Sequence, residues 1–181
     1  GYYPMNTKIK QVAGFLISSA ILILLDQWTK SLAVQYLKDQ PGKPIIDGVF
    51  ELLYSENRGA AFSILQGRQG FLFVITAVVL IFVGYILVKM PARRRYLPLM
   101  ACLVLLFSGA VGNMIDRLSQ GYVVDFLYFS LINFPIFNVA DIYVTSAAAL
   151  FLILMLWYYK EEELEVFSFS AKHHSRKESE S

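Results

Sequence analysis

The sequence predicts an all-α membrane protein with four transmembrane helices and a small β-sheet outside the membrane. Hydrophobic residues make up 56% of the 181 residues and charged residues only 17%, whereas a soluble domain carries about 25% charged residues. The mean hydropathy is +0.52. Four apolar runs are long enough to span a hydrocarbon core of about 30 Å, which takes about 20 helical residues. This chain length accommodates one compact bundle rather than two domains.

The four apolar runs differ in the charges they contain. The first is interrupted by Asp26 and Lys30, Phe71–Val88 and Leu97–Ile115 carry no charge, and the fourth contains Asp141. The first run is too long for a cleaved signal peptide, whose apolar region has about 7–15 residues and ends at small residues. We therefore expect four permanent helices, over about 12–37, 71–88, 97–118 and 137–159.

Basic residues indicate the orientation of these helices. A basic cluster lies in the short loop between the second and third helices: Lys89, Arg93, Arg94 and Arg95. Short loops rich in Lys and Arg stay on the cytoplasmic side of a membrane. Four crossings leave both ends of the chain on one side, so we expect both termini in the cytoplasm.

The segments outside the helices have distinct compositions. Residues 44–66 begin with β-like residues and predict a small sheet on the outer membrane surface. Residues 121–134 contain an apolar run too short to span, which we interpret as an interfacial or re-entrant segment. Residues 161–181 are charged and Ser-rich, which predicts a disordered cytoplasmic tail. Residues 1–4 are interpreted as a remnant of expression, leaving one membrane domain over 5–160.

Four acids fall in a single layer of the predicted bundle. Asp26 lies in the outer half of the first helix and Asp116 at the outer end of the third. Asp141 is in the first turn of the fourth helix, and Asp125 lies in the connection before it. Ionisable groups in apolar surroundings are costly and are usually functional. Their convergence predicts a site near the outer face of the membrane.

Two of these acids form the predicted catalytic pair. Carboxylates about 3 Å apart cannot both ionise, so one holds a proton and the other acts as a base. The base activates water against an amide carbonyl, while the acid polarises that carbonyl and later protonates the amine. Asp125 and Asp141 are the predicted pair, because neither has a basic neighbour within a helical turn. The other acids each have one and are expected to be structural: Asp26 with Lys30, and Asp116 with Arg117.

Other residues argue against competing chemistries. Cys102 is single, which excludes a disulfide and a multi-cysteine metal site, and His173 and His174 fall in the charged tail. Lys30 precedes Ser31, but adjacent helical residues do not face each other, which disfavours a Ser–Lys peptidase. We expect no metal and no cofactor, so chelators should leave activity intact. The net charge of +2 gives no indication of nucleic-acid binding.

Two non-enzymatic interpretations are alternatives. A transporter or channel would use buried acids for protons or cations, but it needs polar groups along a whole pathway. Here the second helix is uncharged, and the inner halves of the third and fourth helices are apolar. A structural membrane subunit would leave this many buried acids unexplained. The distribution favours a site that opens toward one face.

Five sequence blocks resemble the lipoprotein signal peptidase (signal peptidase II) family of bacterial inner membranes. They occur in the family's order: L-D-Q-W-T-K at Leu25–Lys30, E-N-R-G-A-A-F at Glu56–Phe62, G-A-V-G-N-M-I-D-R at Gly109–Arg117, V-V-D-F at Val123–Phe126 and F-N-V-A-D at Phe137–Asp141. The resemblance implies an aspartic endopeptidase that removes signal peptides from diacylglyceryl-modified prolipoproteins, just before the lipidated cysteine. It also implies a short interfacial helix over the site.

The resemblance further implies roles for individual residues. Asp125 and Asp141 would be the catalytic aspartates, in agreement with the choice made from their neighbours. Globomycin, a cyclic peptide, would compete with the diacylated substrate, and the enzyme would contact membrane lipid. The residues expected to bind substrate or support the site are Asn57, Gly59, Asn113, Arg117, Asn138, Asp26, Lys30 and Asp116.

Overall fold

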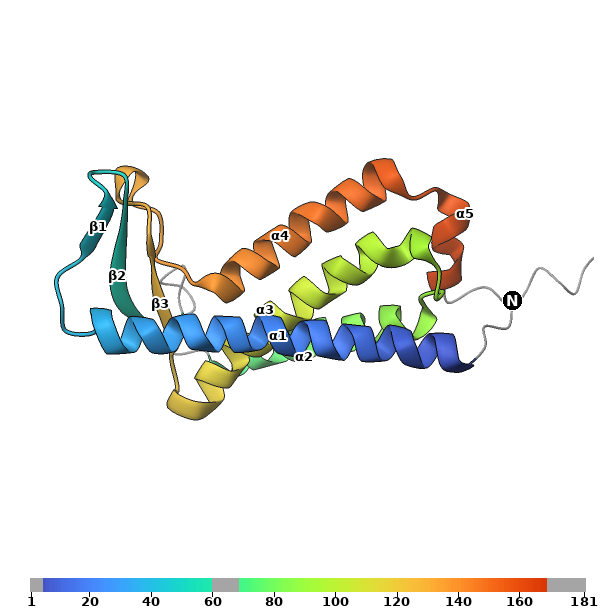
Figure 1. The fold of residues 1–181 in the computed structure, drawn as a ribbon, viewed down its shortest axis with the longest axis horizontal. Helices are drawn as coiled ribbons and strands as arrows, with labels where there is room; N and C mark the ends of the chain where they lie inside the picture. The colour runs from blue at the N-terminus through green and yellow to red at the C-terminus, as the bar shows by residue number, and fades with distance from the viewer. Residues whose placement is uncertain (1–4, 60–68, 169–181) are drawn as a thin grey trace, which may run out of the picture.

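A computed structural model of the protein describes residues 5–59 and 69–168. Its long helices are α1 (Met5–Leu37), α2 (Gln69–Lys89), α3 (Leu97–Gln120) and α4 (Val139–Ile153), and a π-helical turn, Leu154–Tyr158, extends α4. Each is long and apolar enough to cross a membrane. A small sheet closes one end of the bundle (Figure 1). The predicted fold class is confirmed, and the chain is a multi-pass membrane protein.

The first helix begins earlier than expected, at Met5 rather than near residue 12. Its first turns are polar, yet they are held in place by the end of α2. The Lys8 ammonium donates hydrogen bonds to the carbonyls of Leu87, at 2.8 Å, and Met90, at 2.7 Å. These carbonyls at the end of α2 have no partner within the helix, so the lysine satisfies them and extends α1.

The third helix packs against all three other long helices, and glycines on it permit the closest approaches. A Cβ atom on Gly109 would lie 2.6 Å from the carbonyl oxygen of Ala140 in α4. A Cβ atom on Gly112 would lie 2.5 Å from the Asp26 carboxylate in α1. Small residues let membrane helices approach closely, so these glycines bring α1, α3 and α4 together at the level of the acids.

The sheet has three antiparallel strands in the order β1 (Lys43–Ile46), β2 (Phe50–Asn57) and β3 (Val123–Tyr128). Within the segment at 121–134 that is expected to be re-entrant or interfacial, residues 123–128 form β3, which pairs along β2 and so satisfies its backbone groups there. A short helical turn, Ser130–Ile132, follows β3. The rest of the expected β-like segment, residues 60–66, lies outside the described residues.

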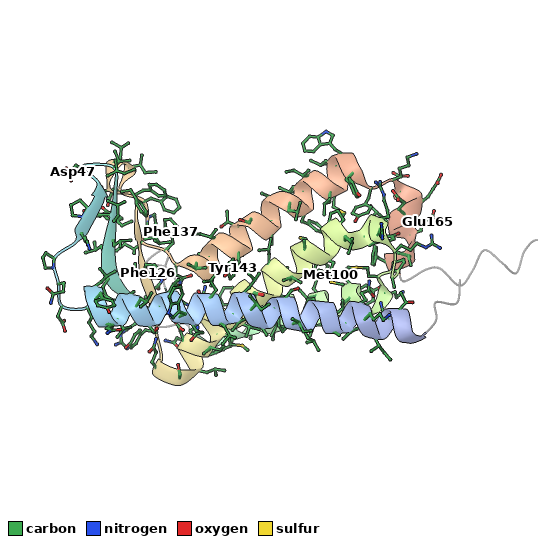
Figure 2. The ribbon with its side chains drawn as sticks, in the orientation of Figure 1. Asp47, Met100, Phe126, Phe137, Tyr143 and Glu165 are labelled. Atoms are coloured by element: carbon green, nitrogen blue, oxygen red, sulfur yellow. The ribbon has the colours of Figure 1, made fainter. Side chains whose placement is uncertain are left out.

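The start of the predicted tail is ordered, contrary to expectation. A short helix, α5 (Glu161–Leu164), and a turn at Glu165–Phe167 fold back at the end of the bundle opposite the sheet. Arg95 pairs with Glu163 at 2.8 Å, and this contact fastens α5 to the start of α3. Figure 2 shows Glu165 at this end and Asp47 at the other. Residues 169–181 lie outside the description.

Candidate active site

The first turn of α4 holds one of the two predicted catalytic acids. Asn138 has extended backbone geometry and caps the helix: its side-chain oxygen accepts from the Asp141 N–H at 2.9 Å. In return, the Asn138 N–H donates to Oδ2 of Asp141 at 3.1 Å. This reciprocal capping arrangement satisfies two backbone donors at the start of the helix. It also fixes the Asp141 carboxylate at the helix N-terminus, where negative charge is stabilised.

The second acid comes from the sheet. Asp125 lies on β3 opposite Ser55 of β2 and is 2% exposed. The Asn57 side chain, at the end of β2, donates to its Oδ2 at 3.1 Å. The Asn138 side chain donates to its Oδ1 at 2.7 Å. Asn138 therefore contacts both acids, and it brings the carboxylates of β3 and α4 to one place.

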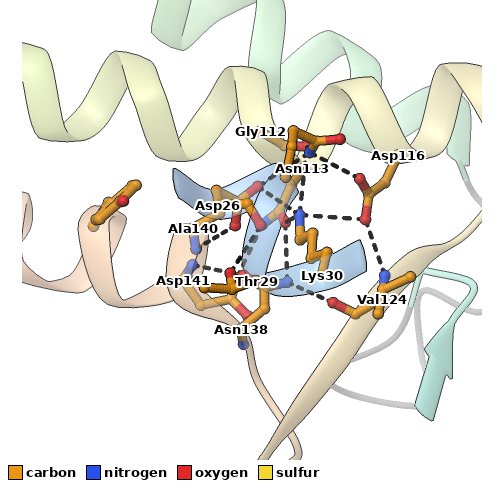
Figure 3. Close-up of polar contacts among 12 residues, drawn as sticks. Asp26, Thr29, Lys30, Gly112, Asn113, Asp116, Val124, Asn138, Ala140 and Asp141 are labelled. Carbon is orange, nitrogen blue, oxygen red and sulfur yellow. Dashed lines mark hydrogen bonds and ion pairs between the residues drawn. The ribbon is translucent and has the colours of Figure 1, made fainter. Parts of the chain in front are cut away.

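An amide on α3 completes the link between the acids. Asn113 donates through Nδ2 to Oδ1 of Asp141 at 3.0 Å. Its Oδ1 accepts two hydrogen bonds, from the Asn138 amide at 3.0 Å and from the Lys30 ammonium at 3.0 Å. These contacts settle which way the Asn113 amide points, because only its oxygen can accept from an ammonium (Figure 3).

A lysine and two carboxylates lie next to the Asn113 side chain (Figure 3). The Lys30 ammonium is 2.9 Å from Asp26 and 3.2 Å from Asp116, and the three side chains are between 0% and 5% exposed. Lys30 and Asp26 pair as their spacing suggests. Asp116, however, pairs with Lys30 rather than with its neighbour Arg117, which corrects the expectation from sequence.

Asp26 and Asp116 also hold the backbone segments that carry the two predicted catalytic acids. Asp26 accepts from the Ala140 N–H at 2.9 Å, one residue before Asp141. Asp116 accepts from the Val124 N–H at 3.0 Å, one residue before Asp125. Each predicted catalytic acid is thus anchored through the preceding peptide group.

The acids face a large cleft between the sheet, α2, α3 and α4. Its volume is about 1560 Å³, and one wall is apolar, formed by residues after β3 such as Phe129 and Phe134. Arg117, Asp125 and Asp141 line the polar side. Among the described residues, no hydrogen bond or ion pair engages the Arg117 guanidinium. Its donors therefore remain available to a ligand in the cleft.

Gly59 and Asn57 form a turn at the rim of the cleft. Gly59 has φ +118°, a backbone region that favours glycine, and its N–H donates to Oδ1 of Asn57 at 3.0 Å. That bond occupies the amide oxygen of Asn57, so the nitrogen faces Asp125. Of the E-N-R-G-A-A-F block, residues 60–62 lie outside the described part of the chain.

Burial and charge give Asp125 an unusual acidity. Its pKa is raised from 3.8 to about 7, first because burial disfavours the ionised carboxyl and second because the Asp141 carboxylate repels it. The amides of Asn57 and Asn138 and the Lys30 ammonium act in the opposite direction. A carboxyl that holds its proton near neutral pH beside a second carboxylate can serve as the acid of an aspartic pair.

The whole arrangement matches a known family along most of the chain. A family model described as signal peptidase (SPase) II matches residues 18–157. The chain belongs to the signal peptidase II family. This confirms the resemblance seen in the five sequence blocks, and it makes the protein a member of a peptidase family.

Individual relatives agree with this assignment. The chain is 45% identical over 139 residues to a lipoprotein signal peptidase of Brevibacillus brevis, covering 77% of this chain and 92% of the relative. It is 42% identical over 149 residues to a lipoprotein signal peptidase of Streptococcus pyogenes, covering 82% and 95%. Two solved bacterial membrane enzymes, at 2.3 and 1.9 Å resolution, match with TM-scores of 0.71 and 0.72. Each is 32% identical to this chain. The first match covers 80% of this chain and 88% of the solved one, and the second covers 82% and 96%.

Gln27 is a supporting residue of this signal peptidase II fold that the sequence reasoning missed. Its amide nitrogen lies 3.1 Å from Asp116, 3.1 Å from the Gly112 carbonyl and 3.2 Å from Asp26. The signal was present in the sequence, since Gln27 is a polar residue in an apolar run beside Asp26. Among the described residues, no group of three or more His, Cys, Asp or Glu side chains is arranged to hold a metal ion.

Proposed function

We propose that this protein is an aspartic endopeptidase that removes the signal peptide from diacylglyceryl-modified prolipoproteins, cutting just before the lipidated cysteine. The observation that carries the proposal is the bridge made by Asn138 between Asp125 and Asp141 at the wall of a large cleft. Membership of the signal peptidase II family and relatives named lipoprotein signal peptidase support the substrate class.

The chemistry follows from one proton shared between two carboxyls. We assign the proton to Asp125, because its raised pKa keeps it protonated to about pH 7. Ionised Asp141 takes a proton from water, whose oxygen attacks the scissile carbonyl carbon. Asp125 donates its hydrogen bond to the carbonyl oxygen as negative charge develops there. Collapse of the tetrahedral intermediate breaks the C–N bond, and the proton held by Asp141 goes to the leaving amine.

Arg117 and the two asparagines prepare the site for this step. Arg117 donates to carbonyl oxygens of the substrate backbone, which requires the free donors it presents to the cleft. Asn113 and Asn138 hold the carboxylates in place through amide donors at 3.0 and 2.7 Å, respectively. Fixed donors of this kind cost no reorganisation during the reaction.

The location of the site fits a substrate that arrives from the bilayer. The basic loop around Arg94 lies at the end of the bundle away from the sheet, so the positive-inside rule puts that end in the cytoplasm. Both termini would then be cytoplasmic, and the cleft would lie near the outer face of a bacterial inner membrane. The lipidated precursor enters the cleft sideways, with its acyl chains still in lipid.

Cleavage of matched precursors tests the substrate class. The purified protein, in nanodiscs, is incubated with a diacylated prolipoprotein and with the same precursor lacking the lipid, and products are separated on gels. We expect a mobility shift for the diacylated precursor alone, and globomycin should suppress it competitively. Equal cleavage of the unmodified precursor would contradict the proposed specificity.

A further inference from the structure

A pair of aromatic side chains meets across the inner part of the bundle, far from the cleft. Phe82 of α2 and Phe151 of α4 pack edge to face, with ring centroids 6.5 Å apart. Both helices pack against α3, and both line the catalytic cleft at their outer ends, through Leu72 of α2 and Asp141 of α4. The aromatic pair therefore lies on the same two helices that border the cleft, further toward the inner end.

The pair lies at the same depth on both helices. Phe82 follows Leu72 by ten residues, and Phe151 follows Asp141 by ten residues. At a rise of about 1.5 Å per residue, each aromatic ring is about 15 Å along its helix from Leu72 or Asp141. On α2, Leu72 and Phe82 lie on neighbouring faces of the helix, and Val79 and Ile86 continue the line from Leu72 at seven-residue spacing.

The surface of α4 above the pair is shaped for close contact with another helix. Its residues there are small: Thr145, Ser146, Ala148 and Ala149 are all exposed, and the first two line the cleft. Small side chains allow the backbones of membrane helices to approach closely. These four residues form a strip on α4 that is continuous with the cleft, because Thr145 and Ser146 belong to both. A segment bound along the strip would have its outer end at the two acids.

Below the pair, a second cavity of about 200 Å³ is partly open and is lined by apolar side chains. Phe82, Phe151 and Met155 line it, together with Leu164 and Phe167 of the C-terminal segment. Both rings of the pair therefore belong to the wall of this cavity.

The length of this strip matches one kind of ligand. Signal peptides have an apolar region of about 7–15 residues, which spans about 10–22 Å as a helix. The stretch of α4 from Asp141 to Phe151 is about 15 Å long, enough for about ten helical residues of a ligand. The length of this stretch therefore complements the apolar region of a signal peptide.

We propose that Phe82 and Phe151 close the inner end of the signal-peptide site and so set the length of apolar helix that the enzyme accepts. This inference rests on the proposed function, because it assumes a signal peptide cut at the two acids. An apolar region longer than this stretch must part the rings, and the cavity of about 200 Å³ beneath them takes only a few additional side chains. Precursors with long apolar regions are therefore cleaved more slowly.

Diacylated precursors that differ only in this length test the proposal. One carries an apolar region of about ten residues and the other about six more. In the parent protein, in nanodiscs, we expect kcat/KM for the long precursor to be about tenfold below that for the short one. In Phe82→Ala and Phe151→Ala the ratio of the two values should come within about threefold of one. Phe82→Trp, which adds bulk, should widen the difference.

A matched control separates this effect from a loss of packing. Phe107 of α3 packs against Phe15 of α1, with ring centroids 5.1 Å apart, away from the pair. Phe107→Ala should keep the parent's ratio. Phe82 is 42% exposed, so its replacement opens little of the core. Phe82→Leu provides a milder variant, expected to give an intermediate ratio, should an alanine variant fold poorly.

The outcomes distinguish the two proposals. A parent that cleaves both precursors equally well overturns the length limit and leaves the proposed function intact. If the ratio of the two kcat/KM values is unchanged in the Phe82 and Phe151 variants, the length limit is likewise overturned and the proposed function stays intact. A parent that cleaves neither precursor overturns the proposed function and the length limit with it.

Discussion

Asn138 lies 2.7 Å from Asp125, side-chain nitrogen to carboxylate oxygen, and this contact joins the start of α4 to the sheet. The same residue caps the helix that carries Asp141. One asparagine thus determines both where α4 begins and where the two acids meet. Its neighbour in the network, Asn113 of α3, donates in the same way to the Asp141 carboxylate.

The two roles of Asn138 can be separated by substitution. Asn138→Ala removes the cap, at about 1 kcal/mol, and also the donor to Asp125. We expect kcat to fall by about 100-fold, because a small displacement of a reacting group has that effect. Asn138→Ser keeps a good capping residue and lacks the amide, so it should recover the melting temperature and leave kcat low. Recovery of kcat in the serine variant would show that only the cap matters.

Lys30 should be essential for stability. Lys30→Met leaves the carboxylates of Asp26 and Asp116 buried without a cation, and the loss of one partner from a buried ion pair destabilises by about 3–5 kcal/mol. Thermal unfolding in detergent measures this loss of stability. The matched variant replaces Lys30 by Met together with Asp26→Asn and Asp116→Asn, which removes all three charges. We expect the triple variant to be more stable than Lys30→Met, and equal or lower stability would contradict the role of the triad.

The raised pKa of Asp125 predicts how pH affects activity. The mechanism requires Asp125 to be protonated, so activity should decline as pH rises through about 7. The Asn57 amide stabilises the ionised carboxyl, so Asn57→Ala should raise the pKa further and move this alkaline limb upward. Rates of precursor cleavage between pH 5 and 9 measure the shift. An alkaline limb that stays in place or moves to lower pH would show that the Asn57 contact does not lower the pKa of Asp125.

The same pKa predicts a pH-dependent stability. A carboxyl whose pKa is higher in the folded protein than the ordinary 3.8 favours folding in acid. This contribution is complete below pH 4 and is lost as pH rises through about 7. Asp125→Asn cannot ionise, so its melting temperature should exceed that of the parent by more at pH 8 than at pH 4. A difference independent of pH would contradict the assignment.

Arg117 should affect substrate binding more than an equivalent surface charge does. Arg117→Ala removes donors from the cleft, and we expect kcat/KM to fall by about 10- to 100-fold, as for the loss of a hydrogen bond to a charged group. Arg94→Ala, on an exposed arginine at the other end of the bundle, is the control and should be unaffected. Arg117→Ala kinetics equal to those of the control would remove Arg117 from the site.

Much of this architecture could be predicted from the sequence, because membrane helices are apolar over a fixed length and their order determines which ends meet. The layer containing Asp125 and Asp141 followed from counting crossings. The strand β3 could not be predicted in this way, because V-V-D-F-L-Y is short and apolar, and these properties suit a strand and an interfacial segment equally well. Its partner, β2, is more than sixty residues away in the chain.

The ion pairs illustrate a second limit. Asp116 and Arg117 are adjacent in sequence, yet side chains of adjacent helical residues diverge by about 100°. Asp116 therefore turns toward Lys30 of α1, and Arg117 turns toward the cleft. Sequence spacing gives pairs within one helix, such as Asp26 and Lys30, but not those made between helices. The folded segment at Glu161–Leu164 was missed for the same reason, because its contact with Arg95 is tertiary.

The most direct test of the central claim is cleavage of a diacylated precursor by Asp125→Asn and by Asp141→Asn, each in nanodiscs and followed by gel shift. Asparagine has nearly the size of aspartate and keeps an acceptor oxygen, so both variants should fold, as judged by melting temperature. We predict that each variant loses cleavage to the detection limit. Turnover at the parent's rate in either folded variant would contradict it.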